Sequence, residues 1–154
     1  MMAKPRGTGP SSARTALSAT IHCLTGCAIG EVLGMVVGAA RGLAATTAIA
    51  LSVALAFVFG YSLTMLPLLR HGLGLGTALR LALAADTASI AVMEVVDNVI
   101  MVVVPGAMDA GLGSPLFWGS LVASLLIAGA AALPLNWWLV RRGQGHALIH
   151  LLHR

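Results

Sequence analysis

The stretch that decides the fold is Asp86-Thr87-Ala88-Ser89-Ile90-Ala91-Val92-Met93-Glu94-Val95-Val96-Asp97-Asn98. Apolar runs flank it on both sides, at residues 79–85 and 99–104, so we predict a membrane-spanning helix. The stretch nevertheless contains three acids, and Glu31 lies in another apolar run. A charge at bilayer depth costs about 3 kcal/mol or more, so ionisable residues at such positions indicate a functional site.

The composition agrees with a membrane protein. Of the 154 residues, 58% are hydrophobic and only 9% are charged, and the mean hydropathy is strongly positive. A soluble domain of this size could not cover itself with polar surface, so we predict an all-α polytopic membrane protein. Four apolar stretches are long enough to cross a hydrocarbon core about 30 Å thick. They are residues 16–40, 44–69, 78–104 and 115–140.

The basic residues predict the orientation of this four-helix bundle. Of the nine Lys and Arg residues, only Arg41 falls on one side of the predicted spans. This asymmetry predicts that both termini are cytoplasmic and that the bundle lies in the cell (inner) membrane. We expect residues 1–15 to be a disordered cytoplasmic tail, residues 16–142 the transmembrane domain, and residues 143–154 an amphipathic cytoplasmic tail. The other eight basic residues are Lys4, Arg6, Arg14, Arg70, Arg80, Arg141, Arg142 and Arg154.

The first span carries two rows of residues with helical spacing. Cys23, Cys27 and Glu31 are spaced by four, so they share one face. A row of glycines from Gly26 to Gly38, which His22 extends, predicts close approach of another helix. The cysteines are either small core residues or, with His22 and Met93, soft ligands for a transition metal such as copper. Residues 24–27 also fit a lipoprotein cleavage site that would lipidate Cys27, although the uninterrupted helical pattern favours a spanning helix.

The third span places its acids on one side. Asp86, Ile90, Met93 and Asp97 fall within a narrow arc, with Glu94 at its edge. Because spans one and three run in the same direction, Glu31 and Glu94 are expected at similar depth, and no basic residue is expected beside them. Burial and mutual repulsion favour neutral acids unless a cation compensates. We therefore predict a cation-binding or proton-relay site formed by Glu31, Asp86, Glu94, Asp97 and Asn98.

Two hypotheses for the function follow. The first is transport or handling of protons or of a transition metal, with the acids as the site. The second is a non-catalytic assembly or accessory subunit, whose protonated acids are packing groups worth about 1 kcal/mol per hydrogen bond. An enzyme that uses Cys23 and Cys27 as a thiol pair is the least favoured interpretation, because no nucleophile and base are paired in the sequence. The expected partners are the lipid bilayer and further copies of the chain, without nucleic acid.

The last span and the tail add interfacial features. Ser120, Ser124, Ala128 and Ala132 form a stripe of small residues that predicts close packing. Residues 136–138, Asn-Trp-Trp, precede Arg141 and Arg142 and are typical of an interfacial belt. In the tail, one helical face carries three histidines, which either face water from the inner leaflet or collect a metal ion. These are His146, His150 and His153.

Three short segments also resemble a known family. They are residues 22–31, His-Cys-Leu-Thr-Gly-Cys-Ala-Ile-Gly-Glu, residues 85–87, Ala-Asp-Thr, and residues 93–98, Met-Glu-Val-Val-Asp-Asn. Together they are similar to a family of small prokaryotic membrane proteins that is known only as a domain of unknown function. The resemblance extends over residues 22–150 and implies a four-helix integral membrane protein. It implies no activity, cofactor or catalytic residue.

Overall fold

A computed structural model describes residues 10–142, and within them the chain forms four α-helices. They are α1 (Pro10–Arg41), α2 (Ala45–Arg70), α3 (Leu75–Val103) and α4 (Pro115–Arg141). Each corresponds to one predicted span, and most ends agree within a few residues. The largest difference is at the start of α1, which begins at Pro10 rather than at residue 16, since proline is well tolerated in the first turn of a helix. The predicted tail at 143–154 lies outside the described residues.

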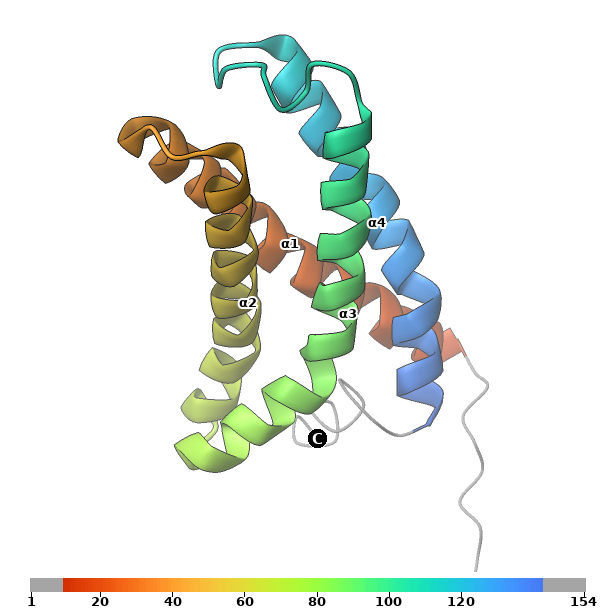
Figure 1. Ribbon diagram of the computed structural model, residues 1–154. Coiled ribbons are helices and arrows are strands. Elements are labelled where there is room, and N and C mark those ends of the chain that lie inside the picture. The colour runs from red at the N-terminus through yellow and green to blue at the C-terminus, as the bar shows by residue number, and fades with distance from the viewer. Residues whose placement is uncertain (1–9, 143–154) are drawn as a thin grey trace, which may run out of the picture.

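The helices alternate in direction, and α1 packs against the other three. Figure 1 shows α2 and α4 on opposite sides of the bundle, with α1 crossing obliquely behind α2 and α3. Short connections join α1 to α2 and α2 to α3, whereas the longer segment 104–114 joins α3 to α4. Gly42 and Gly72 follow the ends of α1 and α2 with φ angles of 61° and 84°, a left-handed conformation that side chains disfavour.

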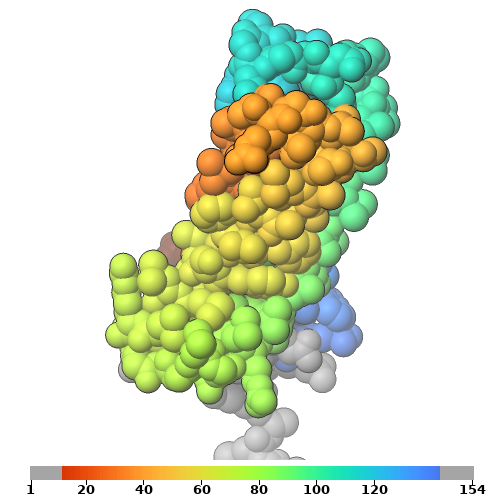
Figure 2. Space-filling model, turned by 60° about the vertical axis from the view of Figure 1, so that its left-hand side comes forward, coloured from red at the N-terminus to blue at the C-terminus, as the bar shows by residue number. Residues whose placement is uncertain are grey.

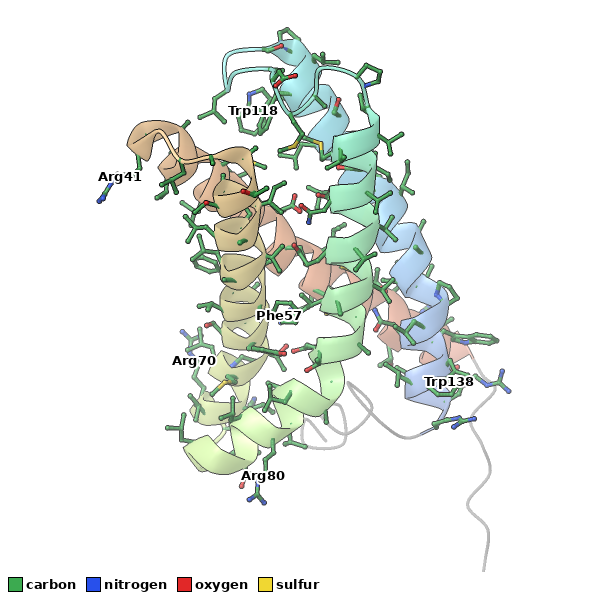
Figure 3. The ribbon with its side chains drawn as sticks, viewed as in Figure 1. Arg41, Phe57, Arg70, Arg80, Trp118 and Trp138 are labelled. Atoms are coloured by element: carbon green, nitrogen blue, oxygen red, sulfur yellow. The ribbon has the colours of Figure 1, made fainter. Side chains whose placement is uncertain are left out.

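All described arginines are exposed, and they are distributed unequally between the two ends of the bundle. The end that holds the start of α1, the end of α2, the start of α3 and the end of α4 is here named the basic end. Arg41 lies at the opposite end, here named the Arg41 end (Figure 3). At the basic end, the guanidinium carbons of Arg141 and Arg142 lie 4.7 and 4.0 Å from the ring centroids of Trp137 and Trp138.

Three of the helices are long and apolar enough to cross a membrane. They are α1 from Ser12 onwards, α2 and α4. The remaining helix, α3, is of similar length, but it carries Arg80 and three acids. Large apolar side chains are exposed on the outer surface, for example Val58, Val95 and Leu126, at 56%, 65% and 64% of full exposure. The described residues thus have the helices and the apolar exterior of a membrane protein.

The course of α3 is bent. Its first turns, which carry Arg80, run across the basic end, and the rest rises through the bundle (Figures 1 and 3). The Thr87 hydroxyl donates to the carbonyl of Leu83 in the preceding turn at 2.6 Å, an interaction that bends helices. Figure 2 shows the side of the molecule formed largely by α2, between the end of α1 and the start of α3.

The glycine row of α1 is confirmed as a helix contact. A Cβ atom at Gly30 would collide with the backbone of Ala56 on α2, and one at Gly34 would collide with Ser52. Gly26 lies against Gly60 in the same way. The backbones of α1 and α2 therefore touch, which leaves the cysteine face of α1 free to pack against α3 and α4.

Candidate functional site

Three of the acids come together where α1 faces α3. Glu31, Glu94 and Asp97, here named the acid cluster, are 3%, 4% and 2% exposed. The carboxyl groups of Glu31 and Asp97 lie within hydrogen-bonding reach of each other, and Glu94 is near both. The Ser124 hydroxyl of α4 donates to Oδ1 of Asp97. Three helices thus surround the acid cluster, because helical spacing turns the acids of α1 and α3 toward the same interior.

The partners of the acid cluster do not balance its charge. Apart from the weak Cys27 thiol beside Glu94, no donor among the described residues meets the carboxyl oxygens of Glu31 or Glu94. An ionised carboxylate only accepts hydrogen bonds, so Glu31 and Asp97 can bond to each other only when one of them carries a proton. Burial of unpaired carboxylates is costly, which favours the protonated form in the same way. The geometry therefore suits a site that holds at least one proton or another cation.

The fourth acid, Asp86, lies closer to the basic end in a second group of polar side chains. The Cys23 thiol donates to Oδ1 of Asp86 at 3.6 Å, and Thr64 of α2 lies beside the same carboxyl. The Asn136 amide donates to Ser89 at 3.0 Å and to Thr20 at 2.9 Å, and Ser89 in turn contacts Cys23. This group is here named the polar network; its members are Thr20, Cys23, Thr64, Asp86, Ser89 and Asn136.

The two cysteines connect the polar network to the acid cluster. Cys23 contacts Asp86, and Cys27, one helical turn further along α1, contacts Glu94. Both thiols are free and buried, at 1% and 0% exposure. The two acid groups of α3 are thus joined by a line of buried polar side chains on α1.

Other predicted site residues lie elsewhere. His22 belongs to the same helical row as the glycines, so it faces α2, where its ring bonds to the backbone of Leu63. Met93 is fully buried in the apolar core beside Cys23 and Cys27. The Asn98 amide donates to the carbonyl of Glu94 within α3 at 2.8 Å. The structure therefore brings Glu31, Glu94 and Asp97 together, and it places His22 and Asn98 in other contacts.

The described residues form no ready metal site. Within residues 10–142, no three His, Cys, Asp or Glu side chains are arranged to hold a metal ion. The two thiols contact different carboxyls, and His22 is directed toward α2. The three tail histidines at 146, 150 and 153 lie outside the described residues.

Several polar residues of the site were not predicted from the sequence. The sequence predicts close helix packing for Ser124 and an interfacial belt for Asn136. Instead Asn136 is 2% exposed and donates two buried hydrogen bonds. A signal was present, because Asn136 continues the row of Ser120, Ser124, Ala128 and Ala132 at the same spacing of four, and all five are buried.

Comparison with known proteins places the chain in a family. The model of a domain of unknown function, DUF4396, matches residues 12–145, which is most of the chain. The chain belongs to the DUF4396 family. The match includes the acid cluster and every member of the polar network. No curated protein and no solved structure matches the chain.

The expected family resemblance is therefore confirmed, together with four helices that suit a small membrane protein. The DUF4396 description carries no activity and no functional residue. Any function proposed for the chain consequently depends on the chemistry of the buried acids.

Proposed function

We propose that this chain is an integral membrane protein whose acid cluster binds and handles protons. The observation that carries the proposal is the contact between Glu31 and Asp97, two buried carboxyls that can bond only through a shared proton. Asp86 and the two cysteines serve as further groups through which a proton moves. The proposal includes α3 as a fourth span, with both termini in the cytoplasm and the basic end at the inner surface of the cell membrane.

The packing of α3 supports its assignment as a span. Its buried face touches α1, α2 and α4, and its outward residues Val95, Val99 and Val102 are 65%, 55% and 63% exposed. In water, such a surface would cost free energy in proportion to its apolar area. In lipid, the apolar outer surface of α3 is in a favourable environment without a protein partner. The acids on the opposite face of α3 are shielded from lipid by the neighbouring helices.

A less supported form of the proposal is that the site binds a soft metal ion such as copper instead of a proton. It would need Cys23 and Cys27 to leave their carboxyl partners and converge on one ion, with Met93 nearby. Elemental analysis of the detergent-purified protein, of Glu94→Gln and of Cys27→Ser tests it. A stoichiometric metal that either substitution removes would support the metal form. The same low metal content in all three would eliminate it.

Infrared spectroscopy tests the proton form directly. A protonated carboxyl has a carbonyl stretching band that an ionised carboxylate lacks, so the protein at neutral pH should show this band. Glu31→Gln and Asp97→Asn should each weaken it, because each removes one of the two carboxyls that share a proton. Asp109→Asn is the matched control: Asp109 is exposed in the connection between α3 and α4, so its loss should leave the band unchanged. A band that is absent, or that survives all the acid substitutions, would contradict the proposal.

The alternative function, an assembly or accessory subunit, also has an observation in its favour. The contacts of Asp97 with Glu31 and Ser124 join three helices, as a packing group would. In that case, the protons are permanent, and the band persists as pH rises until the protein unfolds. A proton-handling site instead loses the band at a pH at which the helical circular dichroism is still intact. Titration of both signals on one sample distinguishes the two functions.

The chain supplies the whole acid cluster by itself, so proton binding requires no second copy. The expected homo-oligomer stays a prediction. Sedimentation of the protein in detergent, with the detergent mass subtracted, gives the number of chains.

A further inference from the structure

The acid cluster has different surroundings toward the two ends of the bundle. Toward the basic end, polar side chains continue from Cys27 to Cys23 and Asp86, and from there to Ser89 and Asn136. Thr87, the residue after Asp86, is exposed, and its hydroxyl lies 2.8 Å from the hydroxyl of Tyr61. Buried hydrogen-bonding groups therefore continue from the acid cluster toward the basic end as far as Asp86 and Asn136.

Toward the Arg41 end, the surroundings are mostly apolar, and the buried polar side chains there are Ser52, which donates to the carbonyl of Glu31, and Ser120. Asp97 is followed one turn later by Met101, and Glu31 is followed one turn later by Met35. Met101 is buried with Phe117 and Leu121 of α4 and Ala107 of the connection, and Met35 and Met108 pack against them. This group is here named the apolar plug. Above it, the Trp118 indole donates to the carbonyl of Leu112 at 2.7 Å, at the end where Figure 3 labels Trp118.

We infer that the acid cluster exchanges protons with one side of the membrane only, the side of the basic end, and that the apolar plug closes the other side. This inference rests on the proposed proton function and adds its direction. Protons move along hydrogen-bonding groups and water, and the side chains of the plug offer neither a strong donor nor a strong acceptor. Apolar cavities in proteins also stay dry. The chain is then a one-sided proton-binding protein rather than a proton channel.

The titratable groups around the acid cluster agree with this asymmetry. Those that contact it within residues 10–142 come from α1 and α3: Cys23 and Asp86 lie toward the basic end, and Cys27 lies at the level of Glu94. The Tyr61 phenol of α2 also lies toward the basic end, beside Thr87. The neighbouring polar groups of α2 and α4 are hydroxyls and an amide, such as Thr64, Ser124 and Asn136. The apolar plug, whose buried members are Met101, Ala107, Phe117 and Leu121, contains no titratable side chain.

Proton leakage through liposomes tests the inference. The purified protein is reconstituted into liposomes that contain a trapped pH-sensitive dye, and a pH gradient is imposed across the membrane. With the natural chain, the gradient should decay no faster than in protein-free liposomes, because the plug is intact. Met101→Ser should accelerate the decay, because a small hydroxyl side chain replaces the apolar one next to Asp97. Phe117→Ala opens the plug from α4 and replaces Met101→Ser if that variant does not fold.

Two controls make the leak specific. Val102→Ser is the same kind of substitution on the neighbouring residue, which is 63% exposed and outside the plug, and it should cause no leak. In the double variant Met101→Ser with Glu94→Gln, the pH gradient should again decay no faster than in protein-free liposomes, because the proton path then lacks an acid.

Three results would overturn one-sided access. The first is a leak through the natural chain that Glu94→Gln stops, since the acid cluster would then be open to both sides. The second is a plug variant, Met101→Ser or Phe117→Ala, that causes no proton leak although its carboxyl band still titrates. The third is a leak through Met101→Ser that Glu94→Gln does not affect. Failure of the proposed function is distinguishable from all three, because it is the absence of a titrating carboxyl band in the natural chain.

Discussion

Among single residues, Asn136 shows how the interior is held together. Its amide donates to Thr20 on α1 and to Ser89 on α3, so one side chain of α4 joins three helices. Both hydrogen atoms of the amide nitrogen are used. In an apolar interior, such bonds contribute to stability, although double-mutant measurements in membranes give only about 0.6 kcal/mol per bond on average.

Replacement of Asn136 by alanine should therefore destabilise the bundle by about 1 to 2 kcal/mol, because two interhelical bonds and some packing are lost. Asn98→Ala is the control, since the Asn98 amide bonds only to a carbonyl of its own helix and the residue is half-buried. Thermal unfolding in one detergent, followed by circular dichroism, compares the two variants with the natural chain. Equal losses of thermal stability in the two variants would show that the interhelical bonds of Asn136 stabilise the bundle no more than the bond of Asn98 does.

At the scale of elements, the contact between α1 and α2 is the closest in the bundle. Gly30→Ala should destabilise it by roughly 1 to 3 kcal/mol, because the added Cβ would collide with the backbone of Ala56, which cannot rotate away. Gly119→Ala on α4 is the matched control. Nothing lies within 4 Å of its Cβ position, so the same substitution should stabilise α4 by up to about 1 kcal/mol through helix propensity. Denaturant titration of both variants in detergent measures the difference, and a tolerated Gly30→Ala would contradict the close packing.

The comparison of elements also shows what a sequence can predict here. The four helices followed from the lengths of the apolar runs, and the buried face of α3 followed from the spacing of Asp86, Met93 and Asp97. The partners of each face did not follow, because they depend on how the helices are rotated against one another. The glycine row directs His22 toward α2, away from the cysteines, and the α4 stripe brings Ser124 to Asp97. From a single sequence, the buried face of each helix can be predicted, but which faces contact one another cannot.

On the scale of the whole molecule, the uneven distribution of arginines predicts the orientation, and cysteine labelling checks it. Gly74→Cys at the basic end and Gly113→Cys near the Arg41 end are matched, because both glycines are exposed and have open space at the Cβ position. The natural cysteines are buried and should not react. A membrane-impermeant maleimide should label Gly113→Cys on intact cells and Gly74→Cys only after the cells are disrupted. The reverse pattern would contradict cytoplasmic termini.

The length of α1 has a consequence for the membrane in which the molecule works. Its 32 residues measure about 48 Å along the axis, and its apolar run at residues 16–40 measures about 38 Å, which exceeds a hydrocarbon core of about 30 Å. A helix with this hydrophobic mismatch leans relative to the bilayer normal, and it leans less where the bilayer is thicker. In Figure 1, α1 runs obliquely to the other three helices. Because Glu31 is carried by α1 and Asp97 by α3, a change in lean moves one carboxyl relative to the other. Under the proposed function, we therefore expect the thickness of the host bilayer, set by its acyl chains, to affect how tightly the two acids share a proton.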